Sequence, residues 1–477
     1  MTVSRDDSHL VCHFYDSSLY NRYLHVLENV ELNVQRPLRA TMKPMNKPVI
    51  PSSWLRGLLA GLIICCGANG NAATDASTRM AQSGMPGAFD CIGNSCPLLE
   101  IAGDWESTLP NGQPSPFRGF ADPSMRRDPD SGRLWLAYSW PSLQVKRSSA
   151  AGWSSQAAQV TPRVDIHLAF SDDHGASWRY LQTLLPAAAA RSPSGEPGQV
   201  VPEVVNLLPV QTESGTQWYG AWLEYFLPEN GGYRNRPSQS FRIVMSRSPG
   251  IPGLADAPKA RLGAMHTDPA WGMDLNLAAL SPETSRCMLW NEPALYHDGK
   301  ELFLALSCMA FRGTAPDLPS SDLVVFATTA QGEPALWRWR YAGKLSGVSE
   351  ARELGGERLT QIDLVPGRDG QLLAVVTPDT WDATAHDFVH HGCRVLEVTE
   401  QDGRLTLARS PNGALKLRTS VMASDAGAAG TAACTYEPSS ATGMVFGKRD
   451  KAGGLSGRNR NSNAHLSTSL HITGLRP

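Results

Sequence analysis

Short apolar stretches separated by polar turns recur along the chain. The stretch "VDIHLAF" (164–170) alternates polar and apolar residues, as a half-buried strand does. The next residues, "SDDHGASW" (171–178), supply Asp, Gly and Ser, which form turns, before Trp178 opens another apolar stretch. Because consecutive strand residues point to opposite faces, the two aspartates and His174 are not expected to converge on one substrate atom. The pattern therefore predicts a β-hairpin tip and not a catalytic cluster.

Two kinds of segment alternate along residues 110–477, and each occurs five times. The first kind has an acidic residue, an apolar strand, a turn and a second strand, as in "WNEPALYHDGKELFLALSC". The second kind is a strand that ends in a polar turn, as in "DLVVFATTAQG". The acidic residues that lead the first kind are Asp122, Glu203, Glu292, Asp363 and Glu437.

One segment of each kind makes four strands, and a four-stranded unit repeated radially is a propeller blade. The repeats therefore predict an all-β fold, a five-bladed β-propeller over residues 110–477, preceded by an N-terminal segment over 73–109. Six blades are the alternative, because residues 80–120 could hold an unrecognised strand or complete the last blade. A β-sandwich with chance similarity between segments is the other alternative.

The composition limits the kinds of molecule that the protein is expected to bind. The 477 residues include 43 Lys+Arg and 45 Asp+Glu, a balance that provides no field for attracting nucleic acid or an anionic membrane. Only 18% of residues are charged, whereas Gly (43) and Pro (34) are frequent, in keeping with an all-β chain. No glycine-rich phosphate loop or nucleotide-binding motif is present, so no cofactor is expected, and we expect a monomer.

Residues 42–72 read as a secretory signal peptide. Basic residues precede an apolar run of about ten residues, which is too short to cross a bilayer, and small residues follow at a cleavage site before Ala73. Residues 1–41 are then expected to be untranslated or disordered, with translation starting at Met42 or Met45. The mature protein is expected to be periplasmic or extracellular; a lipid anchor on Cys65 or Cys66 is the less favoured alternative, because Ile64 is too bulky for the usual pattern.

Six cysteines remain after the signal peptide, an even number that predicts disulfides in an exported chain. Six cysteines allow 15 pairings, of which the simplest is sequential. A zinc site is the alternative, but no C-x-x-C pair or nearby histidine set supports it. The sequential pairs are Cys91–Cys96, Cys287–Cys308 and Cys393–Cys434.

The acids that lead the repeats suggest chemistry. If the five acids occupy one level of a propeller, they ring one end of its channel, and like charges brought close raise some of their pKa values. A carboxyl with a raised pKa acts as a general acid near neutral pH. Glycoside hydrolysis needs such a pair, with one protonated acid and one ionised base or nucleophile.

The chain resembles the five-bladed glycoside hydrolases of the arabinanase, β-xylosidase and invertase type. The stretch "ADPSMRRD" is similar to their first-blade Asp-Pro motif, and "NEPALYHDGKELFLALS" to their third-blade Glu-Pro strand. The resemblance implies Asp122 as base or nucleophile and Glu292 as general acid. It also implies that Glu203 in "VPEVV" positions substrate and tunes the acid, although those families have Asp at this position. A carbohydrate or glycan is then the substrate, with Asp363 among the substrate-binding candidates.

Two other functions remain open. The spacing of Ser171, Asp173, Gly175 and Trp178 resembles the Asp box of sialidases, in which case Arg118 would bind an anionic sugar and Tyr436 with Glu437 would supply nucleophile and partner. A propeller that binds glycan or protein without catalysis would instead use aromatic side chains. The tryptophans near strand ends or loops are Trp140, Trp222, Trp271, Trp290 and Trp381, of which Trp290 is the substrate-binding candidate.

His386 and His390 have the spacing of zinc ligands on a helix, but their surroundings predict a loop, so no metal site is expected.

Overall fold

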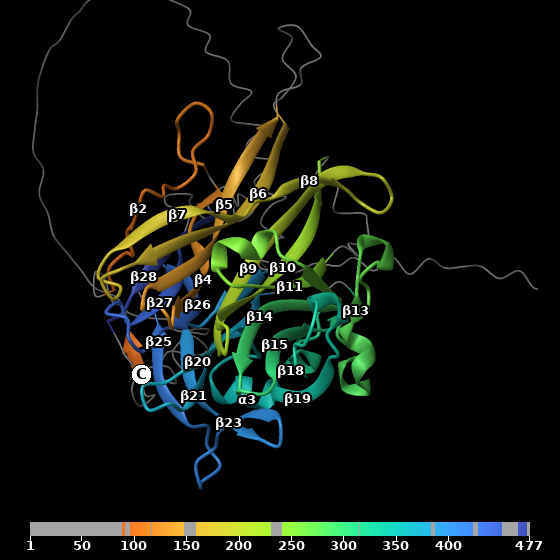
Figure 1. Cartoon of the computed structure of the whole chain (residues 1–477), viewed down its shortest axis with the longest axis vertical. Coiled ribbons are helices and arrows are strands. Elements are labelled where there is room, and N and C mark those ends of the chain that lie inside the picture. Colours follow the sequence, from red (N-terminus) through yellow and green to blue (C-terminus); the bar gives the residue numbers. More distant parts are fainter. Residues whose placement is uncertain are drawn as a thin grey trace, which may run out of the picture.

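A computed structural model describes residues 88–90, 96–115, 117–146, 159–229, 241–313, 315–382, 387–422, 428–450 and 466–474 (Figure 1). The predicted signal peptide, the residues before it, Cys91 and His386 lie outside the described residues.

The described residues form five blade-like sheets, each built outward from a strand that lines the central channel. The first sheet contains β4 (Ala121–Arg127), β5 (Leu134–Lys146), β6 (Gln159–Ser171), β7 (Trp178–Leu185) and β2 (Ile101–Ala102). The second contains β9 (Pro197–Thr212), β10 (Gly215–Pro228), β11 (Phe241–Ser248), β12 (Lys259–Gly263) and β13 (Leu275–Asn276), with β8 (Ala188–Arg191) on the other side of β9. The third contains β14 (Leu289–His297), β15 (Leu302–Met309), β18 (Asp322–Thr328) and β19 (Arg340–Ser346).

The last two blades follow the same plan. The fourth contains β20 (Arg358–Pro366), β21 (Leu372–Asp382), β23 (Cys393–Gln401), β25 (Leu417–Met422) and β1 (Ala88–Asp90), with β22 (Asp387–His390) on β21 and β24 (Arg404–Leu407) on β23. The fifth contains β26 (Ala428–Tyr436), β27 (Met444–Asp450), β28 (Leu466–Ile472) and β3 (Phe117–Gly119). A small extra sheet pairs β16 (Phe311–Arg312) with β17 (Ala315–Pro316).

Helices are short and lie in the connections between strands. Among the described residues, α3 (Val348–Glu353) is α-helical. The 3-10 helices are η2 (Ile251–Ala255), η3 (Pro269–Trp271), η4 (Leu277–Leu280), η5 (Pro282–Thr284), η6 (Leu318–Ser320) and η7 (Pro334–Leu336). None of the helices among the described residues is long and apolar enough to cross a membrane.

The inner strands close into a ring. Each of β4, β9, β14, β20 and β26 contacts the next, and β26 contacts β4 again. The five-bladed propeller is therefore confirmed. The long strands β5 and β6 reach beyond the ring toward the top of Figure 1.

Three short strands near the start of the described residues pair with strands of the blades. Strand β3 pairs in parallel with β28 and completes the last blade, one of the roles considered for residues 80–120. Strand β2 pairs in parallel with β7, and β1 with β25. The strands β1, β2 and β3 therefore contribute to three different blades.

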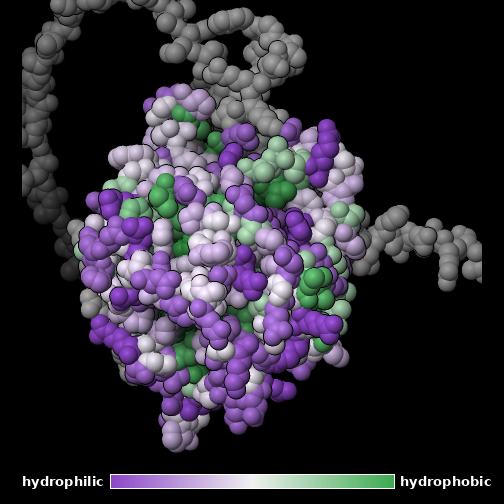
Figure 2. Space-filling view, viewed as in Figure 1, coloured by the Kyte–Doolittle hydropathy of each residue, from purple (hydrophilic) through white to green (hydrophobic). Residues whose placement is uncertain are grey.

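Hydrophobic clusters fill the five interfaces between neighbouring blades. Because each blade packs against a neighbour on both faces, its middle strands are buried on both sides, and all eight residues of β15 are buried. This packing explains why these strands are continuous apolar runs. The molecular face in Figure 2 is mainly hydrophilic, with small separate hydrophobic patches.

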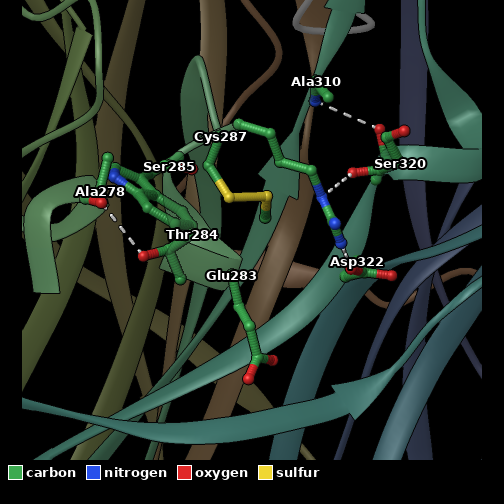
Figure 3. Close-up of a disulfide and its surroundings, with 12 residues drawn as sticks. Ala278, Glu283, Thr284, Ser285, Cys287, Ala310, Ser320 and Asp322 are labelled. Carbon is green, nitrogen blue, oxygen red and sulfur yellow. Dashed lines mark hydrogen bonds and ion pairs between the residues drawn. A yellow bond between two sulfur atoms is a disulfide. The ribbon is translucent and has the colours of Figure 1, made fainter. Parts of the chain in front are cut away.

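Two of the expected disulfides are present. Cys287 is bonded to Cys308, next to the hairpin of β14 and β15, and Cys393 in the fourth blade is bonded to Cys434 in the fifth. Figure 3 shows Cys287 close to Thr284, whose hydroxyl donates to the Ala278 carbonyl at 3.3 Å. Cys96 is also disulfide-bonded.

The stretch "SDDHGASW" forms the expected hairpin tip between β6 and β7. The Ser171 hydroxyl donates to Asp173 at 2.7 Å and accepts from the Gly175 amide at 2.8 Å. Hydrogen bonds from Ser177 to Asp173 hold the pKa of that carboxyl below its usual range. These interactions fasten the turn at the rim of the first blade.

Candidate active site

Every inner strand carries a β-bulge at the same point, where its register with the second strand shifts. One residue in each bulge has a left-handed backbone: φ is 49° at Asp122, 52° at Val204, 54° at Glu292, 49° at Gln361 and 52° at Ala433. A bulge bends its strand and redirects a side chain. Because the conformation recurs in all five blades, it belongs to the fold and is not strain confined to a catalytic site.

The bulges correct the expected ring of five acids. Asp122 and Glu292 occupy the bulge position itself, whereas Glu203 precedes it by one residue in its blade. Asp363 follows its bulge residue by two positions and Glu437 by four. The five acids are therefore not at one level, and the bulge level carries two carboxyl groups.

Three of the predicted acids come from consecutive blades at one end of the channel, where β4 and β14 begin. Strand β9 contacts both β4 and β14, and these three strands lie together near the centre of Figure 1. Asp122, Glu203 and Glu292 are 9%, 1% and 6% exposed. Burial of this kind disfavours the ionised form of a carboxyl group.

Glu292 is held by the neighbouring fourth blade. One of its carboxyl oxygens, Oε2, accepts hydrogen bonds from the Thr360 hydroxyl and from the Gln361 backbone amide. The Glu292 amide donates to the Asn291 side chain at 2.8 Å. These contacts fix the carboxyl group on the bulge.

The pKa of Glu292 is raised from 4.5 to about 7, and burial is the largest cause. Nearby Arg358 and the hydrogen bond from Gln361 oppose the shift, and the negative charges of Asp379 and Asp122 add to it. The side chain therefore keeps its proton to a higher pH than an ordinary glutamate does. The contribution from Asp122 places that carboxyl within electrostatic reach of Glu292.

A cluster in the fourth blade surrounds this carboxyl. Arg358 is 3% exposed, and its guanidinium lies 3.6 Å from the centre of the Phe388 ring. Its Nη2 lies 3.2 Å from Asp379, which also contacts His390 Nδ1 at 2.7 Å. A positive charge is thus held beside Glu292 while its own carboxylate partner balances it.

Asp363 lies deeper in the channel. Both terminal nitrogens of Arg126 donate to its carboxylate, and Asn206 and Thr435 donate to it at 2.8 and 2.7 Å. Asp363 and its three partners come from four different blades. The geometry gives Asp363 a role in joining the blades, and it does not support the substrate-binding role expected for it.

Two other substrate-binding candidates have hydrogen-bond partners other than the acids. Arg118, on β3, donates to Glu106 at 2.6 Å near the surface. Trp290 is 1% exposed and its indole donates to the Gly263 carbonyl at 2.8 Å, so it is a core residue. Of the other tryptophans considered, Trp222 and Trp271 are buried, whereas Trp140 and Trp381 are partly exposed.

The pair that a sialidase-like mechanism would need is not placed at this end of the channel. Tyr436 is 1% exposed, in the cluster between the fourth and fifth blades. Glu437 accepts hydrogen bonds from the amide and hydroxyl of Ser439 in a turn after β26. Neither geometry supports the expected roles of nucleophile and partner, or a role in binding substrate.

No group of three or more His, Cys, Asp or Glu side chains in the described ranges is arranged to hold a metal ion. Sequence reasoning missed Arg358, Asp379, Thr360 and Gln361. Arg358, Thr360 and Gln361 precede Asp363 on β20, and Asp379 pairs with Arg358 from β21. Alignment of the bulges would have pointed to Gln361.

No protein-family model matches the chain, and no curated protein matches it either. Solved structures that resemble it include an α-L-arabinanase from Cellvibrio cellulosa complexed with arabinohexaose, with 12% identity, 74% of this chain and 90% of that chain covered, and a TM-score of 0.37. An α-L-arabinofuranosidase from Podospora anserina in complex with cellotriose has 12% identity, coverage of 76% and 92%, and a TM-score of 0.38. The catalytic domain of an α-L-arabinofuranosidase from Coprinopsis cinerea has 11% identity, coverage of 81% and 97%, and a TM-score of 0.41. Values this low do not assign the chain to a family.

Proposed function

We propose that the protein hydrolyses glycosidic bonds, with Glu292 as general acid and Asp122 as base or nucleophile. The observation that carries the proposal is the position of Glu292. It is a buried carboxyl whose pKa is raised to about 7, at the bulge level that it shares with Asp122. One carboxyl poised to donate a proton and a second nearby are what this reaction requires.

In the proposed reaction, Glu292 gives its proton to the glycosidic oxygen as the bond to the anomeric carbon breaks. Asp122 either attacks that carbon, forming a glycosyl-enzyme that water then hydrolyses with Glu292 as base, or takes a proton from a water molecule that attacks the carbon directly. A carboxyl separation of about 5–5.5 Å corresponds to the first route and about 6.5–9.5 Å to the second. Glu203, in the blade between them, positions the substrate and adjusts the acidity of Glu292.

Export is also proposed, to the periplasm or the extracellular space. The Cys287–Cys308 and Cys393–Cys434 disulfides support an oxidising compartment. The predicted signal peptide supports the same location.

The test is hydrolysis of a panel of aryl glycosides and oligosaccharides of the common neutral sugars. The wild-type protein should hydrolyse at least one, and Glu292→Gln or Asp122→Asn should lower its kcat/KM by about 100-fold or more. Glu333→Gln, which changes an exposed acid of the third blade, is the matched control and should keep full activity. Full activity in Glu292→Gln would remove the assignment, and binding without hydrolysis would favour a propeller that only binds glycan.

A further inference from the structure

Residues 103–115 follow β2 of the first blade and precede β3 of the fifth blade. The Ser107 hydroxyl bonds the carbonyls of Phe117 and Pro141, at 3.2 and 3.3 Å. Phe117 is on β3 of the fifth blade, and Pro141 is on β5 of the first. The segment is therefore fastened to both blades before the chain enters β4.

Trp105 projects from this segment with 78% of its surface exposed. Its backbone is fixed, because its amide donates to Asp104 Oδ1 at 2.8 Å and its carbonyl accepts from the Trp140 indole at 3.0 Å. Asp104 is anchored in turn by the Tyr138 hydroxyl at 2.6 Å and by His167 Nδ1 at 2.7 Å. A rigid backbone thus presents a large apolar ring to solvent.

The backbone of Trp105 is held by a residue on β5, the strand that pairs with the strand of Asp122. Trp140, which holds the Trp105 carbonyl, follows Ser139, and Ser139 pairs with Ala121, the neighbour of Asp122. Strand spacing and rise then put the Cα atoms of Trp140 and Asp122 about 8 Å apart. Trp140 stacks on His167 with ring centres 4.7 Å apart, which stiffens the support beneath Trp105.

A polar pair begins at the residue after Trp105. Glu106, next to Trp105, pairs with Arg118 at 2.6 Å, and the two side chains are 40% and 29% exposed. Because the pair is neutral overall, it favours an uncharged partner with hydroxyl groups. A single ring and one polar pair are also far too small for a stable protein interface, which buries about 800 Å² on each partner.

We propose that Trp105 stacks on a sugar ring of an oligosaccharide whose scissile bond lies at Asp122 and Glu292. The apolar face of a sugar buries against an indole, and Glu106 and Arg118 can bond its hydroxyl groups. This inference rests on the proposed function and deepens it. The substrate is a neutral sugar chain, and Trp105 binds a unit beyond the bond that is cleaved.

Binding is measured in the Glu292→Gln background, so that no ligand is consumed. The probes are neutral arabino-, xylo- and gluco-oligosaccharides of one to six units, titrated by calorimetry. Affinity should increase with chain length for at least one sugar, and Trp105→Leu should weaken binding of the longest probe by about tenfold. Trp105→Phe, which keeps an aromatic ring, should retain most of the affinity.

Leu336→Ala is the matched control, because Leu336 is 74% exposed, and it should leave the dissociation constant unchanged. An unchanged dissociation constant in Trp105→Leu, or no binding by any probe, would overturn the inference. Equal weakening for a monosaccharide and a hexasaccharide would also overturn it, because the ring would then act through the fold. Failure of the wild-type protein to hydrolyse any substrate is a separate result, which counts against the proposed function alone.

Discussion

Replacing Glu292 with glutamine is expected to make folding less sensitive to pH. The raised pKa means that the folded state binds this proton more tightly than the unfolded state does. Between pH 4.5 and about 7 the folded protein therefore binds more protons than the unfolded protein, and the free energy of unfolding falls as the pH rises. The stability that the proton on Glu292 contributes is fully present below the pKa of the unfolded state and is lost above the pKa of the folded state.

The size follows from the same shift. A rise from 4.5 to about 7 corresponds to about 3 kcal/mol between the two ends of this range. Glutamine keeps the volume of the side chain and can still accept hydrogen bonds from Thr360 and Gln361, but it does not ionise. The stability of Glu292→Gln relative to wild type should therefore increase by about 3 kcal/mol from pH 4.5 to pH 8.

Urea unfolding at pH 4.5, 6 and 8 measures this difference for wild type, Glu292→Gln and Glu333→Gln. Since Glu333 is exposed on the same blade, its variant should follow the wild-type curve at every pH. If the Glu292→Gln and wild-type stabilities differ by a constant amount across the range, Glu292 does not carry a raised pKa. The general-acid assignment would then lose its physical basis.

Two further predictions concern the ring of blades. Replacing Cys393 and Cys434 with alanine should lower the free energy of unfolding by about 4 kcal/mol, and replacing Cys287 and Cys308 by about 3 kcal/mol, because the loops span 41 and 21 residues. Urea unfolding checks both, and no loss in either pair would show that the bonds do not constrain the chain. Breaking the buried Arg126–Asp363 pair with Arg126→Met or Asp363→Leu alone should cost about 3–5 kcal/mol, because a charge is left buried. The double variant should cost less than the sum of the singles, and strict additivity in a double-mutant cycle would contradict this.

The repeated strands could be predicted from the sequence because each blade strand is long enough to show an apolar run. The N-terminal strands could not, since β1, β2 and β3 have two or three residues and pair in parallel with distant strands. The acids were found by their place before an apolar strand. The position of each acid along the channel axis could not be predicted in this way. Glu203 stands one residue before the bulge position that Asp122 and Glu292 occupy, and the apolar pattern does not mark which residue of each strand takes that position.

The partners of Glu292 show the same limit. Arg358 and Asp379 lie on neighbouring strands of the fourth blade, 21 residues apart, and they meet only through strand pairing. Nothing in "GERLTQIDLV" marks Arg358 over the other arginines of the chain. Sequence reasoning selected Asp363 in this strand because it is an acid, whereas the bulge places Gln361 beside Glu292.

The central claim is tested most directly by the leaving group. Aryl glycosides of the sugar that the protein hydrolyses would be prepared with phenol and with 2,4-dinitrophenol, and kcat/KM would be measured for wild type and Glu292→Gln. Dinitrophenolate leaves without a proton, so the loss should be about 100-fold or more for the phenyl glycoside and small for the dinitrophenyl glycoside. An equal loss with both leaving groups would contradict the role of Glu292 as general acid.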